Sequence, residues 1–99
     1  MRLTSEQQQA IKSAFEKVFG HGEVVLFGSR VDDEQKGGDI DLFLRISEQN
    51  NNLFNKKIDF LVALKQQIGD QKIDVVLEPY ASSEIKHEVQ QKGILLWRI

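Results

Sequence analysis

The hydrophobic positions follow a helical period in some segments of the chain and form short continuous runs in others. Apolar residues fall on one stripe over 4–19, where Thr4 can cap the helix and a glutamine stands three residues later. Stripes of the same period predict further helices over 53–68, after a break at the asparagines of 50–52, and over 83–92. The short apolar runs predict four strands, at residues 23–28, 39–45, 72–77 and 94–98. The expected order is therefore helix, strand, strand, helix, strand, helix, strand.

Two of the predicted strands, 23–28 and 39–45, follow one another without a helix between them. Strands joined in this way can pair antiparallel, so at least part of the sheet is expected to be antiparallel. We therefore predict an α/β (α+β) fold with a mixed sheet flanked by helices. The length of 99 residues predicts a single domain over 1–99, with room for one hydrophobic core and one site.

The same patterns predict which side chains face the core. In the strand over 39–45, the even positions point to a core and the odd positions, which include two aspartates, point to the opposite face. All six phenylalanines occupy positions compatible with a core, and Tyr80 and Trp97 are expected to be buried at a sheet edge. The helices are expected to bury Ile11, Phe15, Val18, Phe19, Phe54, Ile58, Leu61, Leu64 and Ile68.

The composition narrows the class of protein. Hydrophobic residues at 40% and charged residues at 28% are typical of a soluble globular chain, and no signal peptide or apolar stretch of membrane-spanning length is present. The absence of cysteine excludes disulfides and thiolate metal sites, fits a reducing compartment and predicts a cytoplasmic protein. A net charge of −2 argues against direct nucleic-acid binding, which depends on many Lys and Arg contacts. A phosphate ligand is therefore expected to be a nucleotide with its counter-cation.

Candidate chemistry gathers around two predicted strands. Gly28 and Ser29 end the first apolar run, and Asp39 and Asp41 follow at the start of the next strand. Along a strand, residues i and i+2 point to one face and lie ~6.5–7 Å apart at Cα, so both carboxylates can converge on one divalent cation. A glycine and a serine at a strand end offer a polyphosphate free N–H groups and a hydroxyl. Asp74, on a later strand, could add a third hard oxygen ligand.

Each of these motifs also has an ordinary structural explanation. A glycine–serine pair at a strand end is often only a turn, and alternate aspartates often form a solvated strand face or protect a sheet edge. Asp74 could equally point outward from its strand. The combination, in this order, favours a site for a metal and a nucleotide. His21 and His87 are expected to be solvent-facing or structural rather than ligands.

The segments Gly28-Ser29-Arg30 and Asp39-Ile40-Asp41, followed by Asp74 on a later apolar strand, resemble the nucleotidyltransferase superfamily that includes DNA polymerase β. Length and element order are similar to those of its minimal nucleotidyltransferase (MNT) family. This resemblance implies a DNA polymerase β-like fold, ATP as substrate and a two-metal Mg²⁺ site with Asp39, Asp41 and Asp74 as catalytic ligands. It further implies that Asp74 helps to activate an acceptor hydroxyl. Gly28 and Ser29 would bind the β- and γ-phosphates, and Arg30 would offset charge on the pyrophosphate.

The loop between the two motifs departs from the family pattern. Many minimal members have a small residue and then Arg-Gly after the first arginine, and a serine before the first aspartate; here Val31 and three acids follow Arg30, and Gly38 takes the serine position. The acids Asp32, Asp33 and Glu34 would repel a triphosphate unless they point to solvent or face a basic partner. This loop leaves two functions open.

The first function is transfer of a nucleoside monophosphate, AMP from MgATP, to an acceptor hydroxyl. The resemblance implies that the acceptor is a tyrosine of a helical HEPN-type toxin encoded nearby, and that the chain is its antitoxin in a hetero-oligomer or as a homodimer. The second function is that of a catalytically weak antitoxin subunit, which binds nucleotide or protein and neutralises its partner by complex formation. The acidic loop and the negative net charge support the second, because they could complement a basic partner.

Overall fold

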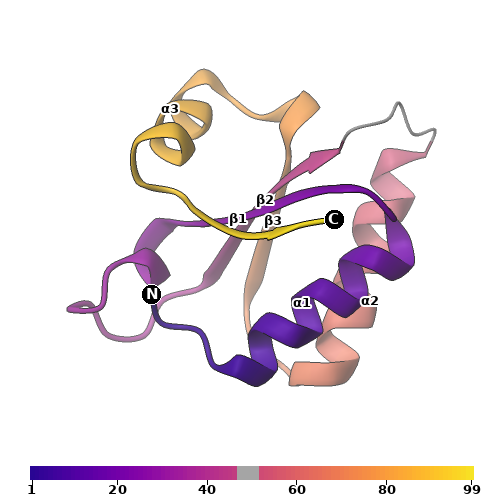
Figure 1. Cartoon of the computed structure of the whole chain (residues 1–99), viewed down its shortest axis with the longest axis horizontal. Helices are drawn as coiled ribbons and strands as arrows, with labels where there is room; N and C mark the ends of the chain where they lie inside the picture. The colour runs from indigo at the N-terminus through magenta and orange to yellow at the C-terminus, as the bar shows by residue number, and fades with distance from the viewer. Residues whose placement is uncertain (47–51) are drawn as a thin grey trace.

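A sheet lies between helices in the computed structural model, which describes residues 1–46 and 52–99 (Figure 1). The helices α1 and α2 cover one face of the sheet, and α3 covers part of the other (Figure 1). The predicted order of helices and strands is confirmed. The elements are α1 (Ser5–Val18), β1 (Gly22–Phe27), the 3₁₀ turn η1 (Gly28–Val31), β2 (Ile40–Ile46), α2 (Leu53–Ile68), β3 (Ile73–Leu77), the 3₁₀ turn η2 (Glu78–Tyr80), α3 (Ser83–Lys92) and β4 (Ile94–Arg98).

Within the described residues the strands form one sheet in the order β3-β2-β1-β4. β1 pairs antiparallel with both β2 and β4, whereas β2 and β3 are parallel, so the predicted mixed sheet is confirmed. The strand limits differ slightly from the prediction, since Gly28 follows β1 and Asp39 precedes β2. The end of β1 and the starts of β2 and β3 therefore lie side by side at one end of the sheet.

The first helix begins as its sequence predicts. Thr4 Oγ1 accepts a hydrogen bond from the Gln7 amide, and Gln7 Oε1 accepts one from the Thr4 amide, each at 3.0 Å. These two hydrogen bonds satisfy N–H groups at the start of the helix, which have no preceding turn to supply an acceptor. The predicted stripe is confirmed as well, because Ile11 and Phe15 are fully buried against the sheet. Of the asparagines expected to break the chain before α2, only Asn52 lies within the described residues, where it precedes that helix.

Both faces of the sheet are packed. Ile40, Leu42 and Leu44 of β2 point toward α1 and α2 and are fully buried, as predicted. On the opposite face a smaller core forms under α3 from Val25, Phe27, Phe43 and Val89. The rings of Phe27 and Phe43 meet edge to face at 6.5 Å. The face that carries Asp41 is therefore apolar in the middle of β2, at Phe43, and polar at both ends, where Asp41 and Arg45 lie.

The prediction for α2 was partly wrong. Leu64 is buried as expected, but Phe54 and Ile58 are 71% and 43% exposed, and the buried anchor is Phe60. Ile58 lies about 160° around the helix axis from Phe60. Apolar residues occupy so wide an arc of this helix that its sequence does not show which part faces the sheet. The exposure of Phe54 also means that not every phenylalanine belongs to a core.

The two other large aromatic residues have different outcomes. Tyr80 was expected to be buried but is 71% exposed, because Pro79 ends β3 and η2 carries the chain away from the sheet. Trp97 does pack at the sheet edge on β4, where its indole N–H donates to the Gln8 carbonyl at 2.9 Å. Lys12 lies over its ring, 4.8 Å from the centroid. In the described part of the chain, no helix is long and apolar enough to cross a membrane.

These exposures give a direct test of the fold. We expect Phe60→Ala to lower the free energy of unfolding by about 3–5 kcal/mol, because it leaves a cavity between α1, α2 and the sheet. The matched variant Phe54→Ala removes the same ring from an exposed position of the same helix and should change stability by less than about 0.5 kcal/mol. Urea unfolding of both variants measures the difference. Similar losses would contradict this orientation of α2.

Candidate functional site

The site is built on a close approach between the end of β1 and the second residue of β2. Asp41 is paired across the sheet with Phe27, so its side chain lies beside the next residue, Gly28. A Cβ placed on Gly28 would lie 2.2 Å from Asp41 Oδ2, and the φ of Gly28 is +76°. Only glycine combines this backbone conformation with the space that the carboxylate needs. The sequence motif therefore reflects a steric requirement as well as a possible ligand.

The parallel pairing of β2 and β3 brings the second and third aspartates together. Asp41 is the direct cross-strand partner of Asp74, so the two side chains lie on the same face of the sheet. Partial burial, followed by the charges of Asp74 and Asp39, the hydrogen bond to Asp74 and the charge of Glu88, raises the pKa of Asp41 to about 6. All the charges that shift the pKa of Asp41 are therefore negative, as expected of carboxylates gathered at a site for a cation.

Asp39 is less closely associated with the other two. It lies just before β2, and its Oδ2 atom is 3.4 Å from the ammonium of Lys72, which precedes β3. Lys72 is 76% exposed at its side chain, so this ion pair is solvated and adds little stability. Among the residues described, no group of three or more acidic or histidine side chains is arranged so that it could hold a metal ion. The structure thus joins Asp41 with Asp74 and pairs Asp39 with Lys72.

Ser29 lies against the other end of the same loop. A Cβ on Gly38 would lie 2.1 Å from Ser29 Oγ, and the φ of Gly38 is +87°. The glycine in place of the family's serine therefore lets the loop pass close to the Ser29 hydroxyl. Both Gly28 and Ser29 line a cleft of about 740 Å³, together with Val31, Asp32, Gln35, Glu88 and Lys92.

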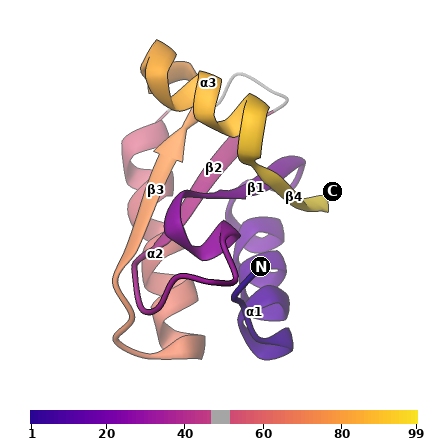
Figure 2. The same cartoon turned by 90° about the vertical axis from the view of Figure 1, so that its left-hand side faces the viewer.

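Arg30 fixes the loop in this structure. Its guanidinium donates to the carbonyls of Arg2 and Gly38 at 2.9 and 3.2 Å, and to Gln71 Oε1 at 3.4 Å. Arg2 reinforces the same loop, because it donates to the carbonyls of Ser29, Asp32 and Gly37 at 2.7–2.9 Å. Figure 2 shows η1 between the start of the chain and α3. The two arginines hold the loop backbone, and this role of Arg2 was missed by the sequence analysis.

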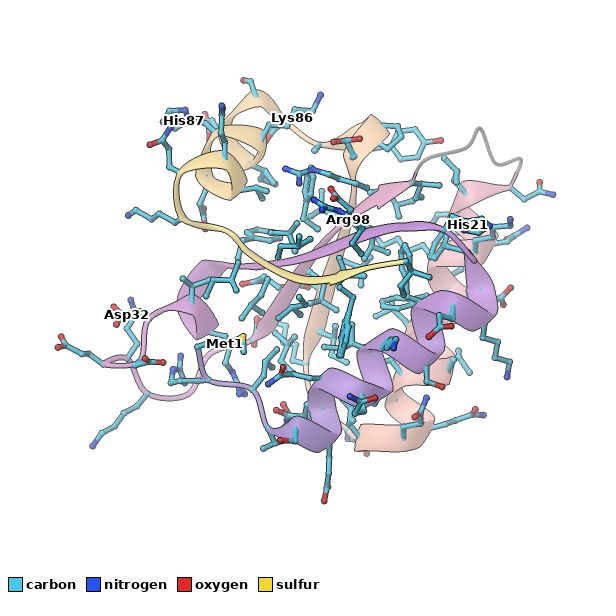
Figure 3. All side chains as sticks on the ribbon, viewed as in Figure 1. Met1, His21, Asp32, Lys86, His87 and Arg98 are labelled. Atoms are coloured by element: carbon cyan, nitrogen blue, oxygen red, sulfur yellow. The ribbon has the colours of Figure 1, made fainter. Side chains whose placement is uncertain are left out.

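The acidic loop residues point mainly to solvent. Asp32, Asp33 and Glu34 are exposed, and Figure 3 shows Asp32 on the loop that projects from the body of the protein. Asp32 Oδ1 accepts the Glu34 amide at 2.9 Å, which folds the loop on itself. His21 and His87 are also exposed, as expected, and lie far apart in Figure 3.

Glu88 is the residue that sequence analysis missed at the centre of the site. Its Oε2 atom accepts the Gly28 amide at 3.0 Å, from a position on α3 that is 60 residues away along the chain. Lys92 stands one turn later on the same helix and lines the same cleft. No local motif marks either residue, because their place in the site depends on how α3 packs over β1. Both alter the charge of the cleft in which Gly28 and Ser29 lie.

Solved structures of similar fold include chains from three toxin–antitoxin complexes. One is the tri-AMPylated HEPN toxin of Shewanella oneidensis in complex with MNT antitoxin, with 20% identity over 94% of this chain and 71% of that chain and a TM-score of 0.70. A toxin–antitoxin with AMP-PNP shares 21% identity over 93% of this chain and 73% of that chain, with a TM-score of 0.74. The toxin–antitoxin MntA-HepT shares 18% identity over 97% and 74%, with a TM-score of 0.71. At identities this low, the structural similarity shows the fold alone.

Family membership rests on the sequence itself. Among curated proteins, none matches this chain. The sequence profile of the family described as "Polymerase beta, Nucleotidyltransferase" matches residues 9–99, which include every candidate site residue from Gly28 to Glu88. The mixed sheet with Asp41 and Asp74 on adjacent strands agrees with that assignment. The chain therefore belongs to the polymerase β nucleotidyltransferase family.

Proposed function

We propose that this protein transfers AMP from MgATP to a tyrosine hydroxyl of a helical HEPN-type toxin and thereby acts as its antitoxin. The observation that carries this proposal is the pair of neighbouring carboxylates, Asp41 and Asp74, beside the Gly28 strand end in a nucleotidyltransferase chain. Structures of the same fold supply the acceptor class, since one contains an AMPylated HEPN toxin and another AMP-PNP. Such a pair of proteins would act in the cytoplasm.

Asp41 and Asp74 would be the first ligands of the divalent cation. Asp41 is partly buried and Asp74 beside it is exposed, their negative charges repel one another, and Gly28 leaves room for the Asp41 carboxylate. Hard oxygen ligands of this kind suit Mg²⁺. Asp39 would join them by leaving its solvated contact with Lys72. Bound Mg²⁺ would neutralise charge on the triphosphate and on the departing pyrophosphate.

The protein's own groups divide the remaining tasks. The Gly28 amide and the Ser29 hydroxyl would bind phosphate oxygens in the cleft that they line. Asp74, on the edge strand, would accept the proton of the acceptor hydroxyl as its oxygen bonds to the α-phosphorus. The bond from the α-phosphorus to the bridging oxygen then breaks and pyrophosphate leaves. Arg30 would reach the pyrophosphate only by giving up its contacts with the carbonyls of Gly38 and Arg2.

The engagement of Arg30 favours a second candidate function. An arginine committed to the loop, together with the exposed acids Asp32 and Asp33, would leave transfer slow while offering a negative surface to a basic partner. In that case the protein neutralises its partner by complex formation and keeps nucleotide binding as a secondary property.

A transfer assay separates the two functions. The protein is mixed with the HEPN-type protein encoded beside it and with MgATP, and intact mass spectrometry measures the addition of AMP units to the partner. We expect wild type to add AMP, and Asp39→Ala and Asp41→Ala to abolish the addition, because both remove proposed metal ligands. Asp70→Asn, which alters an exposed carboxylate after α2, should transfer normally. Neutralisation of the partner without any added AMP would instead support the binding subunit.

Ligand binding gives an independent measurement. Because MgATP binds only the folded state, it should raise the melting temperature of wild type, by an amount that grows with ligand concentration. Asp41→Ala should show a much smaller rise under the same conditions. Asp70→Asn again serves as the control with an intact site. Equal shifts in wild type and Asp41→Ala would exclude Asp41 as a ligand of the bound metal.

The raised pKa of Asp41 predicts how stability depends on pH. The folded pKa of about 6 lies above the ordinary 3.8, so the folded state holds this proton more tightly than the unfolded state does. The stabilisation that comes from this tighter proton binding is fully present below about pH 4. It is lost as the pH rises through 6, where the folded protein must carry the Asp41 charge. Asp41→Asn should therefore melt higher than wild type at pH 7.5, and the difference should shrink toward pH 4. Melting curves across this range in EDTA measure it, and a difference independent of pH would contradict the charge assignment.

A further inference from the structure

The Gly28 amide already has an anionic partner in this structure. Glu88 Oε2 accepts a hydrogen bond from this amide, with 3.0 Å between the nitrogen and the oxygen, in a partly buried setting. Gly28 is the residue that directly follows β1, and its amide is one of the donors that a phosphate oxygen would use. A carboxylate oxygen and a phosphate oxygen are both charged acceptors, so they compete for one N–H group. Bound nucleotide and the Glu88 contact therefore exclude one another at this donor.

Charge strengthens the competition. Glu88 brings a carboxylate to the cleft that Asp32 also lines, and its charge is among those that raise the pKa of Asp41, after burial and the charges of Asp74 and Asp39. A triphosphate entering the cleft would meet this carboxylate at short range. Repulsion between like charges is largest where solvent is partly excluded. Displacement of Glu88 thus lowers the electrostatic barrier as well as freeing the amide.

The helix supplies a place for the displaced side chain. Val89 is buried against β1 and Ile85 is packed beside it, so α3 itself stays in position while Glu88 can rotate. Lys92 is exposed one turn beyond Glu88 and lines the same cleft. A glutamate followed four residues later by a lysine is a favourable pair on a helix surface. Rotation toward Lys92 would take Glu88 away from Gly28 without unfolding any element.

We propose that Glu88 occupies a phosphate position of the nucleotide-free protein and that the triphosphate must displace it. This inference rests on the proposed nucleotide binding and adds a residue that sets the affinity. In the free protein the contact gives the partly buried Gly28 amide a partner that it would otherwise lack. With nucleotide bound, phosphate takes over that hydrogen bond and Glu88 turns toward Lys92.

The test compares the dissociation constant of Mg·AMP-PNP for wild type, Glu88→Gln and Glu84→Gln by isothermal titration calorimetry. Glu84 is an exposed glutamate on the same helix, so its variant carries the same change of charge away from the amide. We expect Glu88→Gln to bind roughly tenfold tighter than wild type, the scale of one charged hydrogen bond that no longer competes. Glu84→Gln should stay within about twofold of wild type.

The possible outcomes are distinct. Binding by Glu88→Gln that equals or is weaker than that of wild type overturns the role of Glu88 while leaving nucleotide binding intact. Failure of all three proteins to bind Mg·AMP-PNP overturns the proposed function and this inference with it. Circular dichroism of each variant verifies that the fold is unchanged.

A measurement on wild type does not depend on any variant. During titration with Mg·AMP-PNP, NMR should show coincident shifts of the Gly28 amide and of the Glu88 side-chain carboxyl carbon. The carboxyl carbon of Glu84 should remain unchanged. A Glu88 carboxyl resonance that does not move while nucleotide binds would overturn the proposal.

Discussion

The site depends on the register of two parallel strands. Because β2 and β3 pair with Asp41 opposite Asp74, the two carboxylates lie side by side on one face, near the end of the sheet where both strands begin. Successive residues of a strand point to opposite faces, so a slip of one residue would separate the carboxylates and turn apolar side chains to solvent. Leu42 and Leu44, buried on the other face, prevent that slip. The packing of the core therefore sets the geometry of the charged site.

A second constraint ties β1 to the same site. The close approach of Gly28 to Asp41 leaves no space for a side chain, and the positive φ of Gly28 directs the chain into η1. Arg2 then fixes the loop through the carbonyls of Ser29 and Gly37, and Arg30 through that of Gly38, whatever the side chains of the loop are. This explains how the loop accommodates acids where the family pattern has other residues: Asp32, Asp33 and Glu34 are exposed, and Asp33 also pairs with the N-terminal ammonium of Met1.

Much of this arrangement could be predicted from the sequence, and the exceptions share a cause. The capped helix α1 and the alternation in β2 are local patterns, and each was confirmed. The orientation of α2 was misjudged, because its apolar residues surround more of the axis than one packed face needs. The contact of Glu88 with Gly28 and the ion pair of Lys72 with Asp39 depend on which segments pack together. Periodicity along the chain contains no information on such contacts.

These missed contacts have a common meaning. Lys72 places a cation on Asp39, and Glu88 places an anionic oxygen on the Gly28 amide, so the protein's own side chains occupy positions where a metal and a phosphate would bind. Both are weakly held, because Lys72 is solvated and Glu88 is a single rotatable side chain on a fixed helix. The charges that shift the pKa of Asp41 are those of Asp74, Asp39 and Glu88, so the repulsion between Asp41 and Asp74 remains. Two carboxylates that repel one another on adjacent strands lower the stability of the fold, so their presence there favours a role in binding a cation.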